Sequence, residues 1–238
     1  MMFDMGSGGR DESGFVQGVM LAVVTNNNDP EKLGRVKLKF PHREIEQESD
    51  WARTLTFMGG KDRGSLFIPE VGDEVLVAFH MGDFSQPYVI GSLWSKTNPA
   101  PSGADEKNNI RKIKSRSGHE VIFDDSDGSE KITVKTKKGH KIEFADQNDE
   151  IKLTDQSGNH NVTISGSGAG NVTVKSSSTK LEITGQGDIT LSSGKSITVK
   201  SAQVNIEAQA ALSLKGGATV DIKSDGIVNI KGSLVKIN

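Results

Sequence analysis

Five histidines are the side chains in this 238-residue sequence best suited to metal binding or proton transfer. They are His42, His80, His119, His140 and His160, and no two of them have the spacing of ligands in a metal site. The chain has no cysteine, which excludes a thiolate zinc site, a cysteine nucleophile and a disulfide framework. Acidic residues are numerous, but none stands beside a cluster of histidine or aromatic residues, as general acid–base catalysis would require. We therefore expect no catalytic site, no bound metal, no cofactor and no enzyme activity.

Two short motifs resemble ligand-binding loops but fail the corresponding templates. The stretch DDSDG at 124–128 has the composition of a calcium loop. Aligning Gly128 with the invariant glycine of such a loop places Phe123 at the first ligand position and Val134 at the last, and neither can bind calcium. The stretch GSGAG at 166–170 is glycine-rich like a dinucleotide-binding loop, but a strand pattern follows it instead of a helix. Both stretches are typical of turns between strands.

Charge and hydropathy exclude several classes of protein. The net charge is −2, from 29 basic and 31 acidic residues, so the chain has no bulk attraction for nucleic acid or for an anionic membrane. No apolar run approaches the length of about 18 residues that a membrane-spanning helix needs. The first residues, MMFDMGSGGRDESG, lack the basic and apolar regions of a signal peptide. We expect synthesis in the cytoplasm without a signal peptide.

The composition changes sharply along the chain. All six prolines occur at or before Pro101, and all twelve aromatic residues occur at or before Phe144. The remainder consists mainly of Val, Ile, Leu, Gly, Ser, Thr, Asn, Lys and Asp. Two architectures therefore share this chain.

The second half of the chain repeats a short unit in which two apolar residues flank one other residue. Thirteen such pairs run from Ile132/Val134 to Val235/Ile237, and their spacing shortens from 9–11 residues to about eight. Alternation of period two predicts short strands with both apolar side chains on one face, and the Gly, Ser, Asn and Asp residues between pairs predict turns. The later pairs are the predicted core of the repeat: Ile189, Leu191, Ile197, Val199, Val204, Ile206, Leu212, Leu214, Val220, Ile222, Val228 and Ile230.

A β-helix fits this repeat better than a stack of hairpins or a sandwich, which would use longer strands and an aromatic core. Either three units form one coil of a single chain, or three chains wind together. One unit of about eight residues buries two aliphatic side chains, which stabilises it by roughly 3–6 kcal/mol. Ordering its backbone costs roughly 8–16 kcal/mol. Three intertwined chains give each strand more partners and leave fewer edges exposed, so we favour a homotrimer.

The first half of the chain predicts a small β-barrel. Five short strand patterns occur in about 80 residues between Phe15 and Trp94. Short strands in this number are typical of an OB fold. The whole fold is then all-β: a flexible leader at 1–13, an OB-fold barrel at 14–95, a linker at 96–109 and an intertwined trimeric β-helix at 110–238.

Several motifs resemble those of the VgrG and phage baseplate-V family, the central spikes of contractile injection systems. The motifs are GRVKLKFP (34–41), Trp51 with Arg53, PEVGDEVLVAFHMGD (69–83), PYVIGSLW (87–94) and IRKIKSRSGHEVIFDD (110–125). Their order, the linker and the repeat all agree with that family over residues 14–238. The resemblance implies a trimer in which OB barrels surround the top of a triple-stranded β-helix needle. Sheath contraction drives such a needle through a membrane.

The chain departs from full-length VgrG proteins in ways that imply partners. It begins almost at the barrel, so either a separate hub or baseplate protein acts at that end, or the sequence is a fragment from which the hub domain was removed. It has no His-x-His element of the kind that binds iron at sharp phage tips, and it ends on a strand pattern. The resemblance therefore implies a blunt tip that docks a PAAR-repeat protein, with which effector cargo could travel. The docking residues would be Leu234, Val235, Lys236, Ile237 and Asn238.

The expected function is a structural, membrane-puncturing spike that joins a hub or inner tube to a tip cap in an injection particle. A single-chain β-helix adhesin or glycan-binding fibre is an alternative, but it would expose aromatic residues late in the chain, where none occurs. An OB-fold nucleic-acid binder would need a basic face. Residues 1–108 carry 11 basic and 16 acidic residues, and the aromatic residues Phe40, Phe67 and Phe79 fit a barrel core better.

Overall fold

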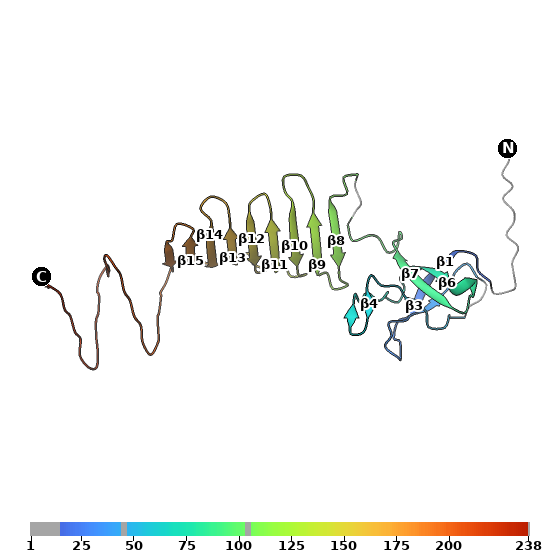
Figure 1. Ribbon diagram of the computed structural model, residues 1–238, viewed down its shortest axis with the longest axis horizontal. Helices are drawn as coiled ribbons and strands as arrows, with labels where there is room; N and C mark the ends of the chain where they lie inside the picture. The colour runs from blue at the N-terminus through green and yellow to red at the C-terminus, as the bar shows by residue number, and fades with distance from the viewer. Residues whose placement is uncertain (1–14, 44–46, 103–105, 238) are drawn as a thin grey trace. The chain divides into compact units, whose positions relative to one another are not determined.

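The computed structural model describes residues 15–43, 47–102 and 106–237 of the chain (Figure 1). The expected leader at 1–13 and residues 103–105 of the expected linker lie outside them. Regular secondary structure in the described residues is β-strand apart from one short 3₁₀ turn, which confirms the all-β class. No helix in this part of the chain is long and apolar enough to cross a membrane. The chain separates into two compact units, residues 1–191 and 192–238, which are described in turn.

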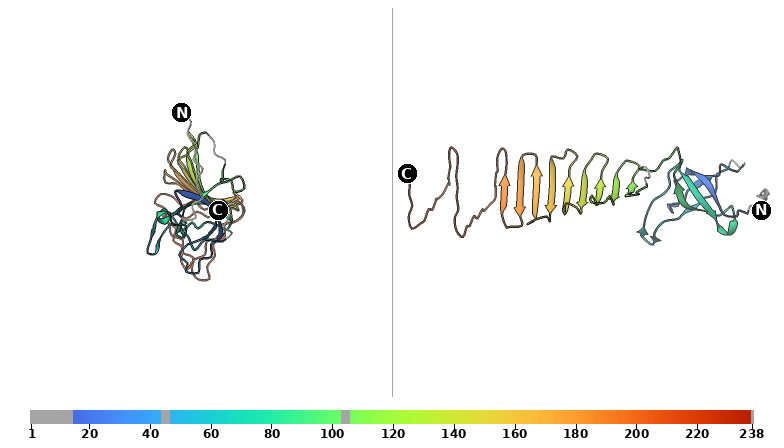
Figure 2. Two further views of the ribbon diagram at one scale, coloured as in Figure 1. Left: turned by 90° about the vertical axis from the view of Figure 1, so that its right-hand side faces the viewer. Right: turned by 90° about the horizontal axis from the view of Figure 1, so that it is seen from above.

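The first part of the chain folds into a curled sheet (Figure 2). Its strands are β1 (Val19–Asn26), β2 (Lys37–Lys39), β3 (Arg53–Thr54), β6 (Glu74–Phe79) and β7 (Pro87–Leu93). They pair in the order β2-β1-β6-β7-β3, antiparallel except for β3 with β7. An isolated bridge between Val36 and Ala52 brings the two ends of the sheet together. The result is a half-barrel of OB type, as the sequence predicts.

Alternation along the strands builds the core of this half-barrel. In β6 every second side chain is buried, so Val75, Val77 and Phe79 lie in the core. The ring of Phe79 lies 5.8 Å from that of Phe40 and 5.4 Å from that of Phe84, measured between ring centroids. Such distances are favourable for aromatic pairs. The full set of buried core residues is Ala22, Val24, Val36, Leu38, Phe40, Ala52, Val75, Val77, Phe79 and Val89.

The segment between β3 and β6 forms a hairpin instead of contributing to this core. It contains β4 (Gly59–Gly60) and β5 (Arg63–Gly64). The prediction that Phe67 is a core residue is wrong, because its side chain is 64% exposed beside this hairpin. Gly64 has a φ of 148°, and a Cβ there would lie 2.4 Å from the Met58 carbonyl oxygen, so the hairpin requires glycine at this position.

Nine further strands follow in simple order, each beside the next one in the sequence. The pairs from β8 to β15 are antiparallel, so consecutive strands form hairpins. The strands are β8 (Ile110–Lys114), β9 (Glu120–Asp124), β10 (Lys131–Lys135), β11 (Lys141–Ala145), β12 (Glu150–Thr154), β13 (His160–Ser165), β14 (Asn171–Ser176), β15 (Thr179–Thr184) and β16 (Ile189–Ser192).

The short strands of the repeat are confirmed over this stretch, but their pairing differs from the stacked coils that the sequence favoured. Each strand pairs with its neighbours in the same chain. Turns make this possible, because glycines with positive φ reverse the chain after only five or six residues of strand. Gly118 (φ 90°) and Gly139 (φ 99°) are examples.

The second unit contains the remainder of the repeat. Residues 193–237 include no strand or helix, although the pairs of apolar residues continue to the end of the chain. Figure 1 shows this segment as a series of extended stretches joined by reversals of direction. Residues 193–237 thus differ from the hairpin sheet, because their extended backbone does not pair into strands within the described chain.

Candidate functional site

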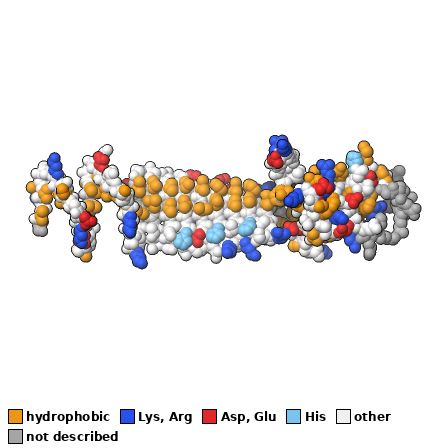
Figure 3. All heavy atoms as spheres, turned by 90° about the horizontal axis from the view of Figure 1, so that it is seen from below, with side chains coloured by type: hydrophobic (Ala, Val, Ile, Leu, Met, Phe, Trp, Pro, Cys, Tyr) orange, Lys and Arg blue, Asp and Glu red, His pale blue; other side chains and the backbone are white. Residues whose placement is uncertain are grey.

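The register of the hairpin sheet places the apolar residues on one face. Ile132 pairs with Phe123 on one side and Phe144 on the other, and the same alignment recurs in each following pair of strands. We call this surface the apolar stripe; Figure 3 shows it as two parallel rows of hydrophobic side chains. Its members are Val121, Phe123, Ile132, Val134, Ile142, Phe144, Ile151, Leu153, Val162, Ile164, Val172, Val174, Leu181 and Ile183.

In a stable single-chain sheet the apolar face is buried and the polar face is exposed to solvent. Here the apolar face is the more exposed of the two. Leu153 on the apolar stripe is 50% exposed, whereas Thr133 and Thr154 on the opposite face are only 7% and 8% exposed. The stripe also lines a groove of about 780 Å³. Because apolar surface gains roughly 25 cal/mol per Å² when it leaves water, a surface of this length favours association.

The opposite face is polar, and its acidic side chains form ion pairs with neighbouring lysines. Glu120 lies within 3.1–3.6 Å of the ammonium groups of Lys112, Lys114 and Lys135. The nearby ammonium group of Lys135, followed by the charges of the other two lysines and opposed by burial, lowers the pKa of Glu120. Further along the sheet, Lys180 pairs with Glu182 at 2.7 Å. This face is suited to remain in contact with water.

The predicted core residues of the repeat divide between the two units. Ile189 and Leu191 lie on β16, and the other ten lie in residues 193–237, where their side chains are 48–71% exposed. Nothing in the described chain buries them. Of the predicted docking residues, Leu234, Val235 and Ile237 are 50–89% exposed, and Asn238 lies outside the described residues.

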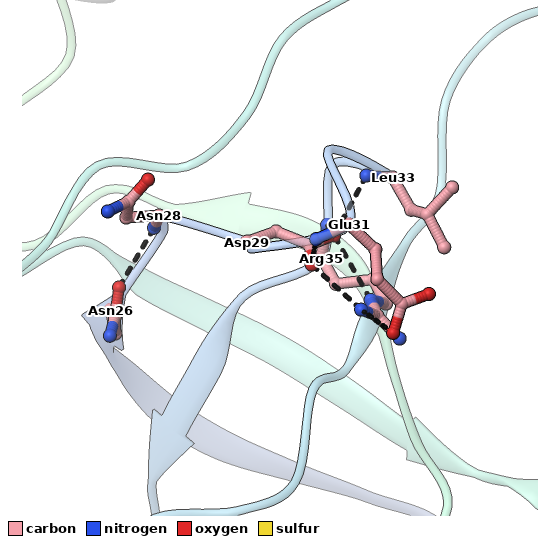
Figure 4. Close-up of polar contacts among 6 residues, drawn as sticks. All are labelled: Asn26, Asn28, Asp29, Glu31, Leu33 and Arg35. Carbon is pink, nitrogen blue, oxygen red and sulfur yellow. Dashed lines mark hydrogen bonds and ion pairs between the residues drawn. The ribbon is translucent and has the colours of Figure 1, made fainter.

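One carboxylate fixes the loop between β1 and β2 (Figure 4). Asp29 accepts hydrogen bonds from the amides of Glu31 and Leu33 and from the guanidinium of Arg35, whose Nη2 lies 2.8 Å from Oδ1. Arg35 also pairs with Glu31 at 3.0 Å. The hydrogen bonds from Arg35, opposed by burial and reinforced by the loop amides, hold the pKa of Asp29 well below its usual range. This network orders the chain directly before β2.

Three of the five histidines lie along one border of the apolar stripe, which their sequence spacing did not indicate. His119, His140 and His160 each follow a turn at the same end of the sheet. Figure 3 shows pale-blue histidine side chains beside the hydrophobic rows. We call these three residues the histidine row. Within the described residues, no group of three or more His, Cys, Asp or Glu is placed to hold a metal ion.

Comparison with protein families identifies the half-barrel. Residues 20–94 match the family described as the type VI secretion system/phage-baseplate injector OB domain. The match covers the described barrel strands from within β1 to the end of β7. It confirms the resemblance that motifs such as GRVKLKFP and PYVIGSLW indicate.

Individual relatives extend the similarity beyond the barrel. The type VI secretion system spike protein VgrG3 of Vibrio cholerae is 35% identical in an alignment 130 residues long that covers 49% of this chain and 13% of VgrG3. The spike protein VgrG5 of Pseudomonas aeruginosa is 35% identical in an alignment 133 residues long that covers 50% of this chain and 17% of VgrG5. The actin cross-linking toxin VgrG1 of Vibrio cholerae is 32% identical in an alignment 130 residues long that covers 49% of this chain and 12% of VgrG1.

These alignments cover about half of this chain but less than a fifth of each relative. Residues 20–94 are thus an injector OB domain, and about half of the chain is distantly homologous to VgrG spike proteins.

Proposed function

We propose that this chain, with its injector OB domain and its homology to VgrG spikes, is a structural spike component of a contractile injection system and works as a homotrimer. The apolar stripe is the observation that supports this most directly. Soluble proteins rarely leave a contiguous apolar surface of this length uncovered. Three copies that turn their stripes inward would bury all three and would leave the opposite face, with the partly exposed lysines Lys135 and Lys180, in water.

The spacing of the repeat divides the chain into two parts, one that pairs within the chain and one that we propose pairs with other copies. Up to Ile189 the apolar pairs begin 8–11 residues apart, and each strand pairs with its sequence neighbours. Beyond Ile197 the spacing is 7 or 8 residues, and the described chain forms no strand. Backbone N–H and C=O groups need partners when they are buried. We propose that residues 193–237 find theirs in two other copies, so that three chains wind into one needle.

The two ends of this trimer would meet different partners. At the OB domain the partner would be a hub or baseplate protein, since residues 20–94 match a domain described as that of a phage-baseplate injector. At the other end, Leu234, Val235, Lys236 and Ile237 would form the platform for a PAAR-type cap, together with Asn238. The resulting rod would cross the target membrane when the particle contracts. Its role would be mechanical and not catalytic.

Solution mass tests the assembly on which the proposal depends. We expect light scattering after size exclusion to give about three times the 25.5 kDa chain mass. The same sample, loaded unheated in SDS, should migrate as the trimer and should become a monomer after boiling. A stable monomer at micromolar concentration would refute the proposal and would return the β-helix adhesin or glycan-binding fibre to consideration.

A further inference from the structure

The histidine row links successive turns at one end of the hairpin sheet. The amide of Lys137 donates to Nδ1 of His119 at 3.4 Å, and the amide of Gln156 donates to Nδ1 of His140 at 3.1 Å. Each bond crosses from one turn to the next turn on the same border, about 9.5 Å away, which is twice the spacing of neighbouring strands. The two histidines therefore hold three turns together beyond the β-ladder itself.

These bonds fix the protonation state of both rings. A backbone N–H can only donate, so each Nδ1 must carry a free lone pair, and the single ring proton must lie on Nε2. An imidazolium carries hydrogen on both nitrogens and cannot accept a bond at Nδ1. Proton uptake by His119 or His140 therefore breaks its link to the neighbouring turn.

His160 has the same place in the row but a different partner. Its Nδ1 lies 2.8 Å from the hydroxyl of Ser176. A hydroxyl both donates and accepts, so it can rotate and accept from an imidazolium. This link survives protonation, because the protonated Nδ1 can donate to the hydroxyl oxygen.

Several charged groups surround the row. Glu120, Lys135, Lys141 and Lys175 line the same groove as the three histidines. The aliphatic part of the Lys137 side chain packs over Gly118 beside His119, and Arg116 of the same turn pairs with Glu70 at 2.8 Å. The Asp155 carboxylate accepts from the His160 amide, and the hydroxyl of Ser157, followed by that amide, lowers the pKa of Asp155 to about 2. Asp155 therefore remains ionised throughout the range in which histidine side chains ordinarily titrate. The pKa of Glu120 is lowered as well, by Lys135 foremost.

We propose that His119 and His140 form an acid-sensitive clasp, which joins the turns of the hairpin sheet at neutral pH and releases them when the rings are protonated. Histidine changes charge between about pH 5 and pH 8. Acid would loosen the border next to the apolar stripe while the ladder between the strands remains intact. The clasp lies within one chain, so it does not depend on the trimer proposed above.

Hydrogen–deuterium exchange at single-residue resolution tests the clasp in the intact protein. Rates at about pH 7.5 and about pH 5 are each divided by the intrinsic rate at that pH. We expect the protection of the Lys137 and Gln156 amides to fall about fivefold or more in acid, the equivalent of one lost hydrogen bond. The amides of Gly139 and Ser157 serve as internal controls because they donate to the Thr136 carbonyl and the Asp155 carboxylate.

A double variant, His119→Asn with His140→Asn, distinguishes protonation of the two histidine rings from other effects of low pH on the protein. The asparagine side-chain oxygen can accept from the same amides and does not titrate in this range. Protection at Lys137 and Gln156 should then be the same at both pH values. Unchanged protection in the wild-type protein, an equal fall at the control amides, or an equal fall in a folded double variant would each overturn the proposal. If the variant does not fold, the wild-type comparison with its control amides decides the question alone.

Discussion

At the scale of single residues, Asp29 has the clearest role in the half-barrel. Its carboxylate joins the guanidinium of Arg35 to two loop amides, and its pKa is depressed well below the ordinary value of 3.8. A group with a depressed folded-state pKa stabilises the protein above its unfolded pKa, and this contribution disappears as the pH falls toward the folded value. Asp29→Asn should therefore lower the melting temperature of the barrel at neutral pH by several degrees, and this difference from wild type should shrink below about pH 4.

Thermal melts of both proteins from neutral to acidic pH measure this effect. Asp62→Asn is a matched control, since Asp62 is exposed in the hairpin between β4 and β5 and its loss should leave the melting curve unchanged. A difference between wild type and Asp29→Asn that stays constant at every pH would show that the carboxylate charge is not the stabilising group.

At the scale of the elements, adjacent residues of β13 distinguish the two faces of the hairpin sheet. Ile164 lies on the apolar stripe, opposite Ile151, while Thr163 lies on the polar face, opposite Lys152. Ile164→Asp would place an unpaired carboxylate in the proposed interface, at a cost of roughly 3–5 kcal/mol per copy. Thr163→Asp introduces the same residue one position earlier, beside a lysine. We expect the first variant to be monomeric and the second to assemble normally.

Analytical ultracentrifugation over a range of concentrations distinguishes these outcomes. Both variants place aspartate, a poor strand former, in the same strand, so its intrinsic effect cancels in the comparison. Normal assembly of Ile164→Asp would mean that the apolar stripe is not the surface through which copies meet.

At the scale of the whole molecule, the two units should contribute differently to the assembly. A chain ending at Ser192 retains the OB domain and the apolar stripe but lacks the segment without strands of its own. We expect this truncated chain to form trimers by light scattering but to dissociate in unheated SDS, whereas the full chain resists. The physical reason is that burial of the stripe is reversible, whereas interwound backbones must unwind together. If the truncated trimer also survives unheated SDS, residues 1–192 alone are sufficient for SDS resistance, and the expected role of residues 193–238 is wrong.

The sequence correctly predicted the short strands and their apolar faces, which depend on local alternation. It did not predict which strands pair with one another. The pair Ile132/Val134 defines a strand and its apolar face without reference to any partner, and the structure confirms both. The same pattern does not specify which strand lies beside it, so hairpins and coils could not be distinguished. Phe67 was misplaced because hydrophobicity alone does not show that its segment leaves the barrel as a hairpin.

The histidine row illustrates the same limit at the candidate site. His119, His140 and His160 are about twenty residues apart, a spacing that matches no ligand pattern. They align because alternate turns of a meander lie at the same end and because each histidine directly follows its turn. A sequence search for side chains at equivalent positions of successive hairpins would have found them.

The neighbour-to-neighbour order of β8 to β15 also has a consequence for how the protein forms. Each strand pairs with the strands before and after it in the sequence, so the loops that must close during folding are short, and low contact order favours rapid folding. The sheet can therefore form turn by turn as the chain leaves the ribosome, before any second copy is present. Its apolar stripe then remains exposed to solvent until other copies of the chain bind, and the rate of this association depends on the concentration of the chain. Under the proposed trimer, synthesis of several chains close together on one messenger would shorten that exposed interval.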